Sequence, residues 1–532
     1  MPTLKIDGIE VAVEAGTNLI EAAFKAGKVV PHFCYHPKLS VAGNCRMCLV
    51  EIEGLRKPEI ACNTQVRDGM VVKTESDKLK KLRQGVLEFL FLNHPLDCPV
   101  CDKAGECKLQ DYYLEHGKYV SRLHEGKVRK PKRLDIGTHI ILDTERCVLC
   151  SRCVRFCDEV SKTSELRILE RGSHSTIGIH PDRRLDNRYS ICTTDVCPVG
   201  ALTSKDFRFQ ARVWYLERVQ SICGGCANGC NIEAHHYRGE VKRFMPRRND
   251  SVNDTWMCDD GRLSWHATQA VDRLNKAQVG AGREGTFQAG LDAALASLKG
   301  VVSGRGAGAV GFVLSPQATL EENFLLASLA KELGSALFLV TGNPVGSAKN
   351  DDDGFLIRAD KNPNSAGARL VGSTFGAKNP GQLVAALESG AIKALVVLNN
   401  DVVGKAKEAG LNSTVFGKLE SLVVLSTHKN ASVEAASVAL PLATYLETEG
   451  SWINAASRVQ KFQRAVNSKG EARTGLELIP ALAQGLGVAQ EVRSAHRIFA
   501  ALAEALSPLA GLTYEKLGEA GVSLSAASSQ AA

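Results

Sequence analysis

The sequence predicts a multidomain protein whose first half is α+β and whose second half is α/β. Two observations lead to this prediction. All 17 cysteines of the 532-residue chain fall between Cys34 and Cys258, so a cysteine-dense front precedes a cysteine-free back. From about Gly280, short apolar runs alternate with helical patterns, which is typical of a parallel sheet covered by helices. A chain of this length is expected to form several domains.

The cysteine usage indicates metal binding in a reducing compartment. Disulfide frameworks belong to short secreted chains, whereas this sequence is long and shows no signal peptide. The longest strongly apolar stretch, 86–92, is too short to cross a bilayer, so membrane association is expected only through partners. The net charge of +7 is mild and accompanies no motif that reads nucleic acid, which argues against nucleic-acid binding.

Residues 1–78 are expected to form a domain around four cysteines. Apolar residues nearly alternate around Asp7-Gly8, which predicts a β-hairpin, and Thr17 or Asn18 then caps a short helix that ends at Gly27. The spacing C-x10-C-x2-C-x13-C follows, at Cys34, Cys45, Cys48 and Cys62. This arrangement resembles the β-grasp ferredoxins, which implies one [2Fe-2S] cluster on these residues. A four-thiolate zinc site would use the same residue types, but the long first spacing favours iron.

Residues 79–118 are expected to bind a second cluster. The pattern from Leu79 to Leu92 predicts an amphipathic helix. The candidate ligands come next: His94, Cys98, Cys101 and Cys107. Three thiolates leave one corner of a [4Fe-4S] cube open, and the position of His94 fits that corner. The stretch NHPLDCPVCDKAGECKLQD resembles the histidine-ligated segment in the large iron–sulfur subunit of the NADH–quinone oxidoreductases, respiratory complex I. Related segments occur in NAD-linked hydrogenases and formate dehydrogenases.

A basic run follows this segment. Its members are Lys118, Arg122, Lys127, Arg129, Lys130, Lys132 and Arg133. Two interpretations remain open, a solvated connector and a docking surface for an acidic partner subunit.

Residues 119–215 are expected to form a ferredoxin-like [4Fe-4S] domain. Three cysteines spaced by two residues wrap a cubane cluster, and a distant Cys-Pro closes it. The ligands in this pattern are Cys147, Cys150, Cys153 and Cys197. Cys157 completes the run of the two-cluster ferredoxins, but only Cys192 lies nearby to support another cluster. Two thiolates cannot hold a cube, so Cys157 and Cys192 are interpreted as unligated.

Residues 216–272 carry a fourth set with the spacing C-x2-C-x3-C-x27-C. Its members are Cys223, Cys226, Cys230 and Cys258. The pattern resembles the small [4Fe-4S] domain that opens the molybdopterin oxidoreductases. In those enzymes a lysine typically stands two residues after the last cysteine, between cluster and pterin, whereas this chain has Asp260 there. We therefore expect no molybdopterin.

Residues 273–521 are expected to form an α/β scaffold without a cofactor. Buried strands are predicted at 310–314, 336–340, 394–398 and 422–425, with a helix over 320–333. The glycines at 304, 306 and 308 precede a strand, so they lack the context of a phosphate loop. LIRADKNPNSAGA and the E-x-x-G-S-x-x-N stretch, matched by Glu447, Gly450, Ser451 and Asn454, resemble the molybdopterin-oxidoreductase-like domain of the same large complex I subunit. Residues 522–532 are expected to be a disordered tail.

The resemblance spans nearly the whole chain and implies an electron-transfer subunit of an NADH:quinone oxidoreductase. Such a subunit carries relay clusters, one [2Fe-2S] and three [4Fe-4S], but neither the NADH site nor the quinone site, and it has no catalytic residue of its own. The implied partners are an NADH/FMN-binding subunit, a thioredoxin-like [2Fe-2S] subunit and the quinone-module subunits, at the cytoplasmic face of a bacterial inner membrane. The alternatives are a molybdenum-dependent formate dehydrogenase subunit and the electron-transfer subunit of an NAD-linked hydrogenase.

Overall fold

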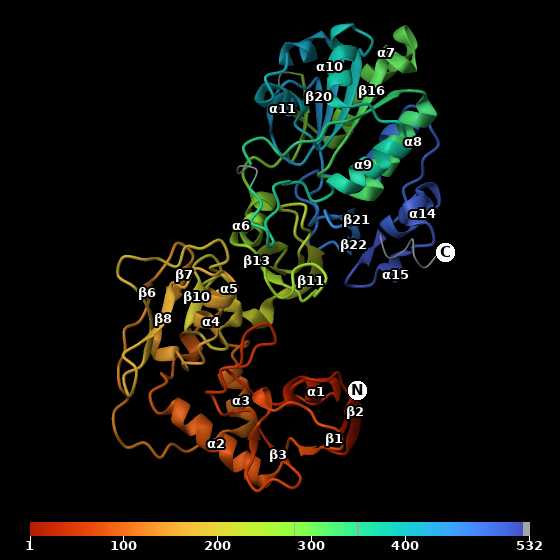
Figure 1. Ribbon diagram of the computed structural model, residues 1–532. Coiled ribbons are helices and arrows are strands. Elements are labelled where there is room, and N and C mark those ends of the chain that lie inside the picture. Colours follow the sequence, from red (N-terminus) through yellow and green to blue (C-terminus); the bar gives the residue numbers. More distant parts are fainter. Residues whose placement is uncertain (281, 348–350, 525–532) are drawn as a thin grey trace. The chain divides into compact units, whose positions relative to one another are not determined.

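The computed structural model describes residues 1–280, 282–347 and 351–524, and the chain divides into two compact units. The first unit comprises residues 1–216 and the second comprises residues 217–532 (Figure 1). This boundary separates the first three candidate ligand sets from the fourth. The finer divisions expected within each unit stay predictions.

The N-terminal part of the first unit is a five-stranded sheet with one short helix. The strand order is β2-β1-β5-β3-β4, and the strands are β1 (Thr3–Ile6), β2 (Ile9–Ala12), β3 (Leu49–Ile52), β4 (Glu59–Ile60) and β5 (Val71–Lys73). The predicted hairpin is confirmed, with Ile6 opposite Ile9. Asp7 and Gly8 both have positive φ, as a two-residue turn requires. Asn18 caps α1 (Leu19–Lys25) by accepting a hydrogen bond from the Glu21 N–H at 3.0 Å.

Two helices flank the second ligand set. The helix α2 (Asp77–Phe91) begins two residues earlier than predicted because Ser76 caps it, accepting from the Leu79 N–H at 3.2 Å. A single 3-10 turn, η2 (Cys98–Val100), and α3 (Lys108–His116) follow.

The remainder of the first unit consists of two small sheets and two short helices. One sheet has the order β10-β7-β6 and the other is the hairpin β8-β9. The strands are β6 (Leu134–Asp135), β7 (Ile140–Leu142), β8 (Leu166–Leu169), β9 (Thr176–Ile179) and β10 (Leu202–Ser204). The helix α4 (Arg152–Glu159) begins within the 147–153 loop, and α5 (Cys192–Val196) ends directly before Cys197. This part is the expected ferredoxin-type region.

The second unit opens with an antiparallel sheet of β11 (Glu217–Ile222), β12 (Asn231–Tyr237) and β13 (Glu240–Pro246). The first three cysteines of the fourth set lie in the turn between β11 and β12. The last, Cys258, is the N-cap of α6 (Asp259–Leu263). The sheet therefore fixes one side of the set and the helix fixes the other.

A seven-stranded sheet forms the centre of the second unit, in the order β15-β14-β20-β19-β18-β16-β17. The four predicted strands are confirmed and parallel, as β16 (Val310–Leu314), β17 (Ala336–Leu339), β18 (Ala394–Leu398) and β19 (Ser421–Ser426). Three strands were not predicted: β20 (Val438–Pro441), which is parallel to β19, and the antiparallel pair β14 (Ala277–Val279) and β15 (Arg283–Gly285). The sheet is thus mixed at one edge.

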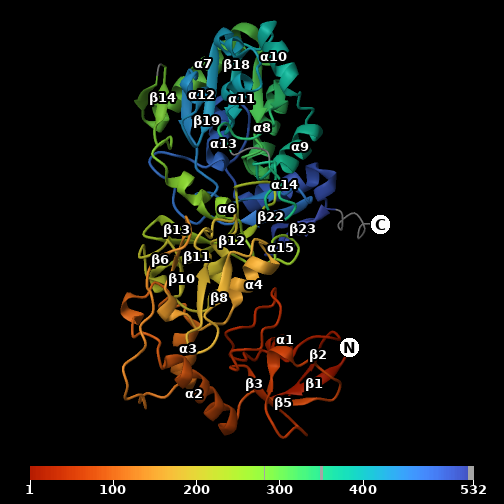
Figure 2. The same ribbon diagram turned by 60° about the vertical axis from the view of Figure 1, so that its left-hand side comes forward.

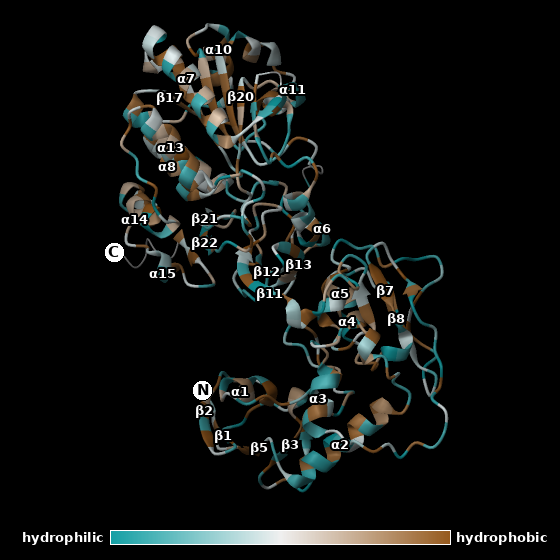
Figure 3. Cartoon of the chain, turned by 180° about the vertical axis from the view of Figure 1, so that it is seen from behind, coloured by the Kyte–Doolittle hydropathy of each residue, from teal (hydrophilic) through white to brown (hydrophobic). Residues whose placement is uncertain are grey.

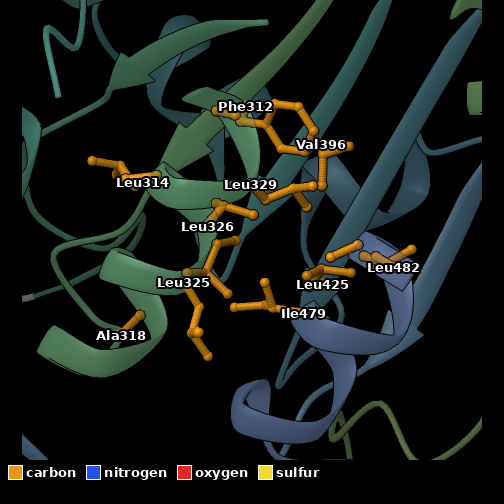
Figure 4. Close-up of a cluster of buried hydrophobic side chains, with 14 of the residues drawn as sticks. Phe312, Leu314, Ala318, Leu325, Leu326, Leu329, Val396, Leu425, Ile479 and Leu482 are labelled. Atoms are coloured by element: carbon orange, nitrogen blue, oxygen red, sulfur yellow. The ribbon is translucent and has the colours of Figure 1, made fainter. Parts of the chain in front are cut away.

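Helices cover both faces of this sheet. The helices on one face are α7 (Phe287–Arg305), α8 (Leu320–Leu333), α9 (Ser365–Thr374), α13 (Gly475–Gly485) and α14 (Ala495–Ala505). On the other are α10 (Pro380–Glu388), α11 (Val402–Glu408) and α12 (Ala431–Glu434). Alternate strand residues point to opposite faces, so Phe312 and Leu314 pack with α8 and α13, whereas Val313 packs on the other side (Figure 4). The central parallel strands β16 and β18 are correspondingly apolar and buried at every position (Figure 3).

The third sheet of the second unit contains β21 (Gly450–Ile453), β22 (Arg458–Phe462) and β23 (Val522–Ser523) (Figure 2). It connects the C-terminal part of the chain to the β11–β13 sheet, because β22 contacts β11. The expectation of a disordered tail from Val522 is wrong for its first residues, because Val522 and Ser523 pair with β22. Positions 525–532 lie outside the described residues.

Two further expectations concern loops and membranes. The glycines at 304–308 connect α7 to β16 through a 3-10 turn, η6 (Ala307–Ala309), which is the helix-to-strand context expected for a structural loop. Among the described residues, no helix combines the length and apolarity needed to span a bilayer.

Candidate metal centres

Contacts between thiols join the first set. Hydrogen bonds from the Cys45 and Cys62 thiols lower the pKa of Cys34, and a hydrogen bond from Cys62 lowers the pKa of Cys48. Cys34, Cys48 and Cys62 are buried, and Cys45 is half-buried. Gly43 and Arg46 both have positive φ, which lets the loop curl around the thiols. The four sulfur atoms therefore occupy one place, as a four-thiolate site requires.

The third set lines a single cavity. The Cys147, Cys150, Cys153 and Cys197 side chains form part of its wall. The rest of the wall is mostly apolar and includes Leu142, Ile177 and Val199. Burial raises the pKa of Cys147 to about 12 and that of Cys150 to about 11, and neighbouring thiols add to both shifts. Four thiols that line one enclosed space are the donor set that a cubane cluster uses.

The second set is gathered less tightly. Cys101 is buried, Cys107 is half-buried and Cys98 is exposed. Cys98 and Cys101 influence each other electrostatically, as do Cys101 and Cys107. The His94 ring lies 5.9 Å from the Phe91 ring. Burial, followed by the Arg146 and Lys127 charges, lowers its pKa to about 4, so it is the neutral imidazole that metal binding requires. These interactions link the three thiols only in pairs, and His94 lies beside Phe91.

The fourth set is the most enclosed. Its four cysteines are all buried. Burial raises the pKa of Cys223 to about 12, and the pKa values of Cys230 and Cys258 rise well above their usual range for the same reason. Electrostatic interactions with each of the other three thiols add to the rise in the pKa of Cys258. All four sulfur atoms thus converge between β11, β12 and α6.

Hydrogen-bond donors surround this fourth set. The Asn228 Nδ2 donates to Cys230 Sγ at 3.1 Å, and the Gly261 N–H donates to Cys258 Sγ at 3.3 Å. Asn228 is itself held from two sides: Arg358 Nε donates to its Oδ1 at 3.1 Å, and Asn454 Nδ2 donates to its backbone carbonyl at 3.0 Å. The two segments that resemble the molybdopterin-oxidoreductase domain therefore hold the ligand loop in place.

Glu447, Gly450 and Ser451 have structural contacts of their own. Glu447 forms a buried ion pair with Arg273, with 2.9 Å between Oε2 and Nη2. The Ser451 hydroxyl donates to Glu321 at 2.7 Å. A Cβ on Gly450 would lie 2.5 Å from Thr319, so only glycine fits there. The stretch thus links the cluster loop to the α/β core.

Two arginines of α4 join the first and third sets. Arg155 Nη2 donates to the Cys34 carbonyl at 2.5 Å and to the Cys150 carbonyl at 3.2 Å. Asn44 Nδ2 donates to the Leu149 carbonyl at 3.2 Å. Arg152, which is buried, donates to the Tyr35 carbonyl. One helix therefore holds the two ligand loops side by side.

Backbone contacts join the third set to the second. The Lys108 N–H, next to Cys107, donates to the Pro198 carbonyl, next to Cys197, at 2.9 Å. A Cβ added to Gly200 would overlap Cys101 Sγ, so the chain after Cys197 lies directly against a thiol of the second set. The three sets of the first unit are thus in contact in the order first, third, second.

Sequence reasoning did not identify Arg155 or Asn228. Asn228 stands inside the C-x3-C loop, and an amide beside a ligand is a signal that could have been noticed. Arg155 has no such signal, because the Cys34 carbonyl that it binds is 121 positions away in the sequence. Cys157 and Cys192 are buried, and Cys157 lies close enough to Cys153 to influence it electrostatically.

The donor sets fit iron–sulfur clusters. Buried thiols with raised pKa values are poor sites for free thiolates, and a coordinated metal offsets that cost by replacing the proton. Glycines at positions 200 and 261 let backbone approach the sulfur atoms, since a Cβ on Gly261 would lie 3.0 Å from Cys223 Sγ. The cysteines of the four sets are free thiols and not disulfide partners.

Family models match most of the chain. A 2Fe-2S iron–sulfur cluster binding domain matches residues 1–77, and the iron–sulfur binding region of NADH-ubiquinone oxidoreductase G matches 83–122. The ferredoxin-like domain of NADH-quinone oxidoreductase subunit 3 matches 137–203, and an NDSU1/NuoG-like 4Fe-4S domain matches 216–266. A molybdopterin oxidoreductase family matches 295–485. Iron–sulfur-binding domains and a molybdopterin-oxidoreductase-type domain are therefore present, as expected.

Individual proteins show the same likeness. A NAD⁺-reducing [NiFe]-hydrogenase structure is 30% identical over 40% of this chain and 91% of its own, with a TM-score of 0.36, which supports no statement about the fold. The NADH-quinone oxidoreductase G subunit of Rickettsia felis is 40% identical over 63% of this chain and 50% of its own length. The corresponding G subunit of Rickettsia conorii is 30% identical over 94% of this chain and 92% of its own length. Because this match covers most of both proteins, the chain belongs to the family of NADH-quinone oxidoreductase G subunits.

Proposed function

We propose that this chain is an iron–sulfur electron-transfer subunit that relays electrons from an NADH/FMN-binding subunit toward quinone-reducing subunits. In this proposal Cys34, Cys45, Cys48 and Cys62 hold a [2Fe-2S] cluster. Three [4Fe-4S] clusters are held by His94 with Cys98, Cys101 and Cys107, by Cys147, Cys150, Cys153 and Cys197, and by Cys223, Cys226, Cys230 and Cys258. The clusters supply one-electron chemistry, and the protein supplies position, burial and hydrogen bonds.

One observation carries the relay proposal: hydrogen bonds directly connect the ligand loops of the first unit. Arg155 binds carbonyls of Cys34 and Cys150 at once. The backbone at Lys108 binds the backbone at Pro198, so the second and third sets share a contact. A subunit that only stabilised isolated clusters would have no need for such contacts. They support a continuous route through the first, third and second sets.

The fourth set is proposed to stabilise the fold of the second unit and to lie off the main route. Its ligand loop is held at Asn228 by residues from two distant segments, Arg358 and Asn454. Removing the metal would release all of these contacts together. A structural role of this kind predicts that loss of a ligand affects assembly more than electron flow.

The α/β domain is proposed to be a scaffold without molybdopterin. Asp260, exposed on α6, stands where a lysine links cluster and pterin in the molybdenum enzymes. No cysteine follows Cys258, so the common thiolate ligand for molybdenum is missing. Ser451, a possible hydroxyl ligand by type, is fully buried and donates to Glu321. These residues favour a role in packing over cofactor binding.

The proposed partners follow from the family. They are the NADH/FMN-binding subunit, a thioredoxin-like [2Fe-2S] subunit and the quinone-module subunits of a peripheral arm. The proposed location is the cytoplasmic face of a bacterial inner membrane, reached through those partners.

The test is to tag the chain, purify its native complex gently from membranes, and identify the co-purifying subunits by mass spectrometry. Iron analysis and electron paramagnetic resonance (EPR) are then done on the same sample. We expect a flavin subunit, membrane subunits and about 14 iron atoms in this chain's clusters once those of other subunits are subtracted. A soluble complex with a hydrogenase, or molybdenum bound to this chain, would contradict the proposal.

The variant Cys157→Ser tests whether Cys157 is a cluster ligand. Cys157→Ser is expected to leave the iron content and the EPR signals unchanged, because Cys157 is interpreted as buried packing. Loss of about four iron atoms would instead make Cys157 a ligand.

A further inference from the structure

A basic groove lies beside the second ligand set. It has a volume of about 390 Å³. Its lining includes one carboxylate, Asp97, and five cationic side chains: Lys132, Arg133, Arg146, Arg208 and Arg212. Pro99 and Val100, from the turn between Cys98 and Cys101, form one wall, so any occupant of the groove lies directly over a ligand loop.

Two of the five cations are neutralised within the protein. Lys132 Nζ lies 2.7 Å from Asp97 and 2.8 Å from Glu145. Arg146 lies 2.8 Å from Asp97 and 3.4 Å from Asp143. These contacts form a closed network that fastens the end of the basic run to the ligand segment. Three carboxylates therefore account for the Lys132 and Arg146 charges.

The other three cations form no ion pair among the described residues, although the Asp102 and Asp143 charges act on Arg208 from a greater distance. Arg212 donates to the Pro99 and Cys101 carbonyls, the latter at 2.8 Å. Arg208 stacks on the Phe209 ring with its Cζ 4.8 Å from the centroid, and its buried Nε has no acceptor in the part of the chain that the structure describes. Within that same part, Arg133 forms no ion pair. The groove thus carries a net positive charge and one buried N–H that needs a partner.

The rim of the groove is apolar and exposed. The Phe209 side chain is 62% exposed, Val100 is 61% exposed and the neighbouring Leu96 is 82% exposed. Phe209 has a φ of 63°, a backbone conformation that non-glycine residues seldom adopt, and its N–H is held by Asp102 at 2.8 Å. Exposed aromatic and aliphatic side chains mixed with arginine are typical of protein interfaces and not of pockets for small anions.

We propose that this groove docks an acidic segment of another subunit, with carboxylates on Arg133 and Arg208 and an apolar side chain on Phe209. Arginine forks match carboxylates in a bidentate manner, and both Arg133 and Arg208 line the groove. The docked segment would also cover the exposed Cys98. The identity of the occupant as another subunit rests on the proposed function.

The test uses the native complex purified through a tag on this chain. Phe209→p-benzoylphenylalanine places a photocrosslinker at the rim, and mass spectrometry identifies the peptide it captures. The expected product is an Asp/Glu-rich peptide of another subunit. A crosslink to residues 217–532 of the same chain, or no crosslink in an intact complex, would overturn the proposal.

Charge variants provide a second measurement. Arg133→Glu and Arg208→Glu are expected to lower the recovery of the partner subunit about tenfold at moderate salt, whereas Arg56→Glu, an exposed control in the same unit, leaves it unchanged. Arg208→Gln, which keeps the size of the side chain, should give a smaller loss, and unchanged EPR signals of the first and third sets show that the unit is folded. Equal recovery for all variants would refute the docking site. Failure of the proposed function would look different, since the wild-type complex itself would then lack flavin and membrane subunits.

Discussion

The second and fourth ligand sets use nearly the same residue types but are built in different ways. In the fourth set every thiol is buried, and side-chain and backbone donors already point at the sulfur atoms. In the second set Cys98 is exposed, and His94 packs on Phe91. The fourth candidate set is thus enclosed by the fold, whereas the second is partly open at Cys98.

The difference matches what the two sites are proposed to do. A site that stabilises a fold benefits from burial and from ligands contributed by several segments, because metal binding then adds to folding free energy. A site at the end of a relay must lie near the surface, where an electron can leave for a partner. Exposure of Cys98 and the adjacent basic groove suit the second role.

The largest expected effect comes from removing one ligand at each site. Cys258→Ser should reduce the amount of assembled complex about tenfold or more, because the buried set holds together β11, β12 and α6. Cys98→Ser should leave assembly nearly normal and abolish only the EPR signal of the second set. Immunoblots of native gels and EPR spectra check both outcomes. Equal assembly defects in the two variants would break the comparison.

A pH effect is expected in the scaffold behind the fourth set. Burial raises the pKa of Glu321 to about 7, while its carboxylate accepts hydrogen bonds from Ser451 and Tyr514. The unfolded chain has the ordinary value near 4.3. Between these two values the folded state binds more protons than the unfolded one, so stability falls as pH rises. We expect the second unit to lose about 2–3 kcal/mol between pH 5 and pH 8.

Glu321→Gln isolates this contribution. A glutamine can accept from the Ser451 N–H and donate to the two hydroxyls, which are able to reverse their roles. The variant should therefore fold and show a flatter pH dependence in pulse proteolysis of the second unit. An unchanged pH profile would mean that another buried carboxyl group, for example Glu322, whose pKa burial also raises, accounts for the dependence.

Local sequence signals predicted the elements of the α/β domain well. The helix over 320–333 has the predicted bounds because Thr319 and Glu322 form a capping box at one end and Gly334 ends it with a left-handed turn. The strand at 310–314 is apolar at every position because helices cover both faces. The β14–β15 pair escaped prediction because each strand has only three residues, and the pairing of β14 with β20 is fixed only by tertiary contacts.

The candidate ligand sets were likewise predictable only in part. Cysteine spacing indicates which thiols share a cluster, because each loop must wrap a small cage. It does not reveal which polar groups come near the sulfur atoms from distant segments. Asn228 and Arg358 lie 130 positions apart, and the contact between them exists only in the folded chain. The basic groove is a similar case, since Arg133 and Arg208 come from two loops that are 75 positions apart in the sequence.

Adding one methyl group at Gly200 should disturb the second set without affecting the fourth. Gly200→Ala places a Cβ on top of Cys101 Sγ, so the second set must shift. We expect a destabilisation of about 1–3 kcal/mol and a weakened EPR signal from this set only. Gly85→Ala is the matched control: it lies within α2 with no atom within 4 Å of the added Cβ, and it should stabilise the helix by about 0.5–1 kcal/mol.

The smallest expected effect concerns the electronic environment of the fourth set. Arg358 donates to Asn228, whose amide donates to Cys230 Sγ, so the guanidinium charge strengthens a hydrogen bond that favours the reduced cluster. Arg358→Gln should lower the midpoint potential of this cluster by about 20–60 mV, which corresponds to a hydrogen bond of about 0.5–1.5 kcal/mol. EPR-monitored redox titration measures the shift. Arg369→Gln, which removes another arginine of the same segment that lies 4.0 Å from Asp360, should leave the potential unchanged. Equal shifts in both variants would mean that any nearby positive charge changes the potential of the cluster. The hydrogen bonds around the fourth set would then not distinguish it from the second set.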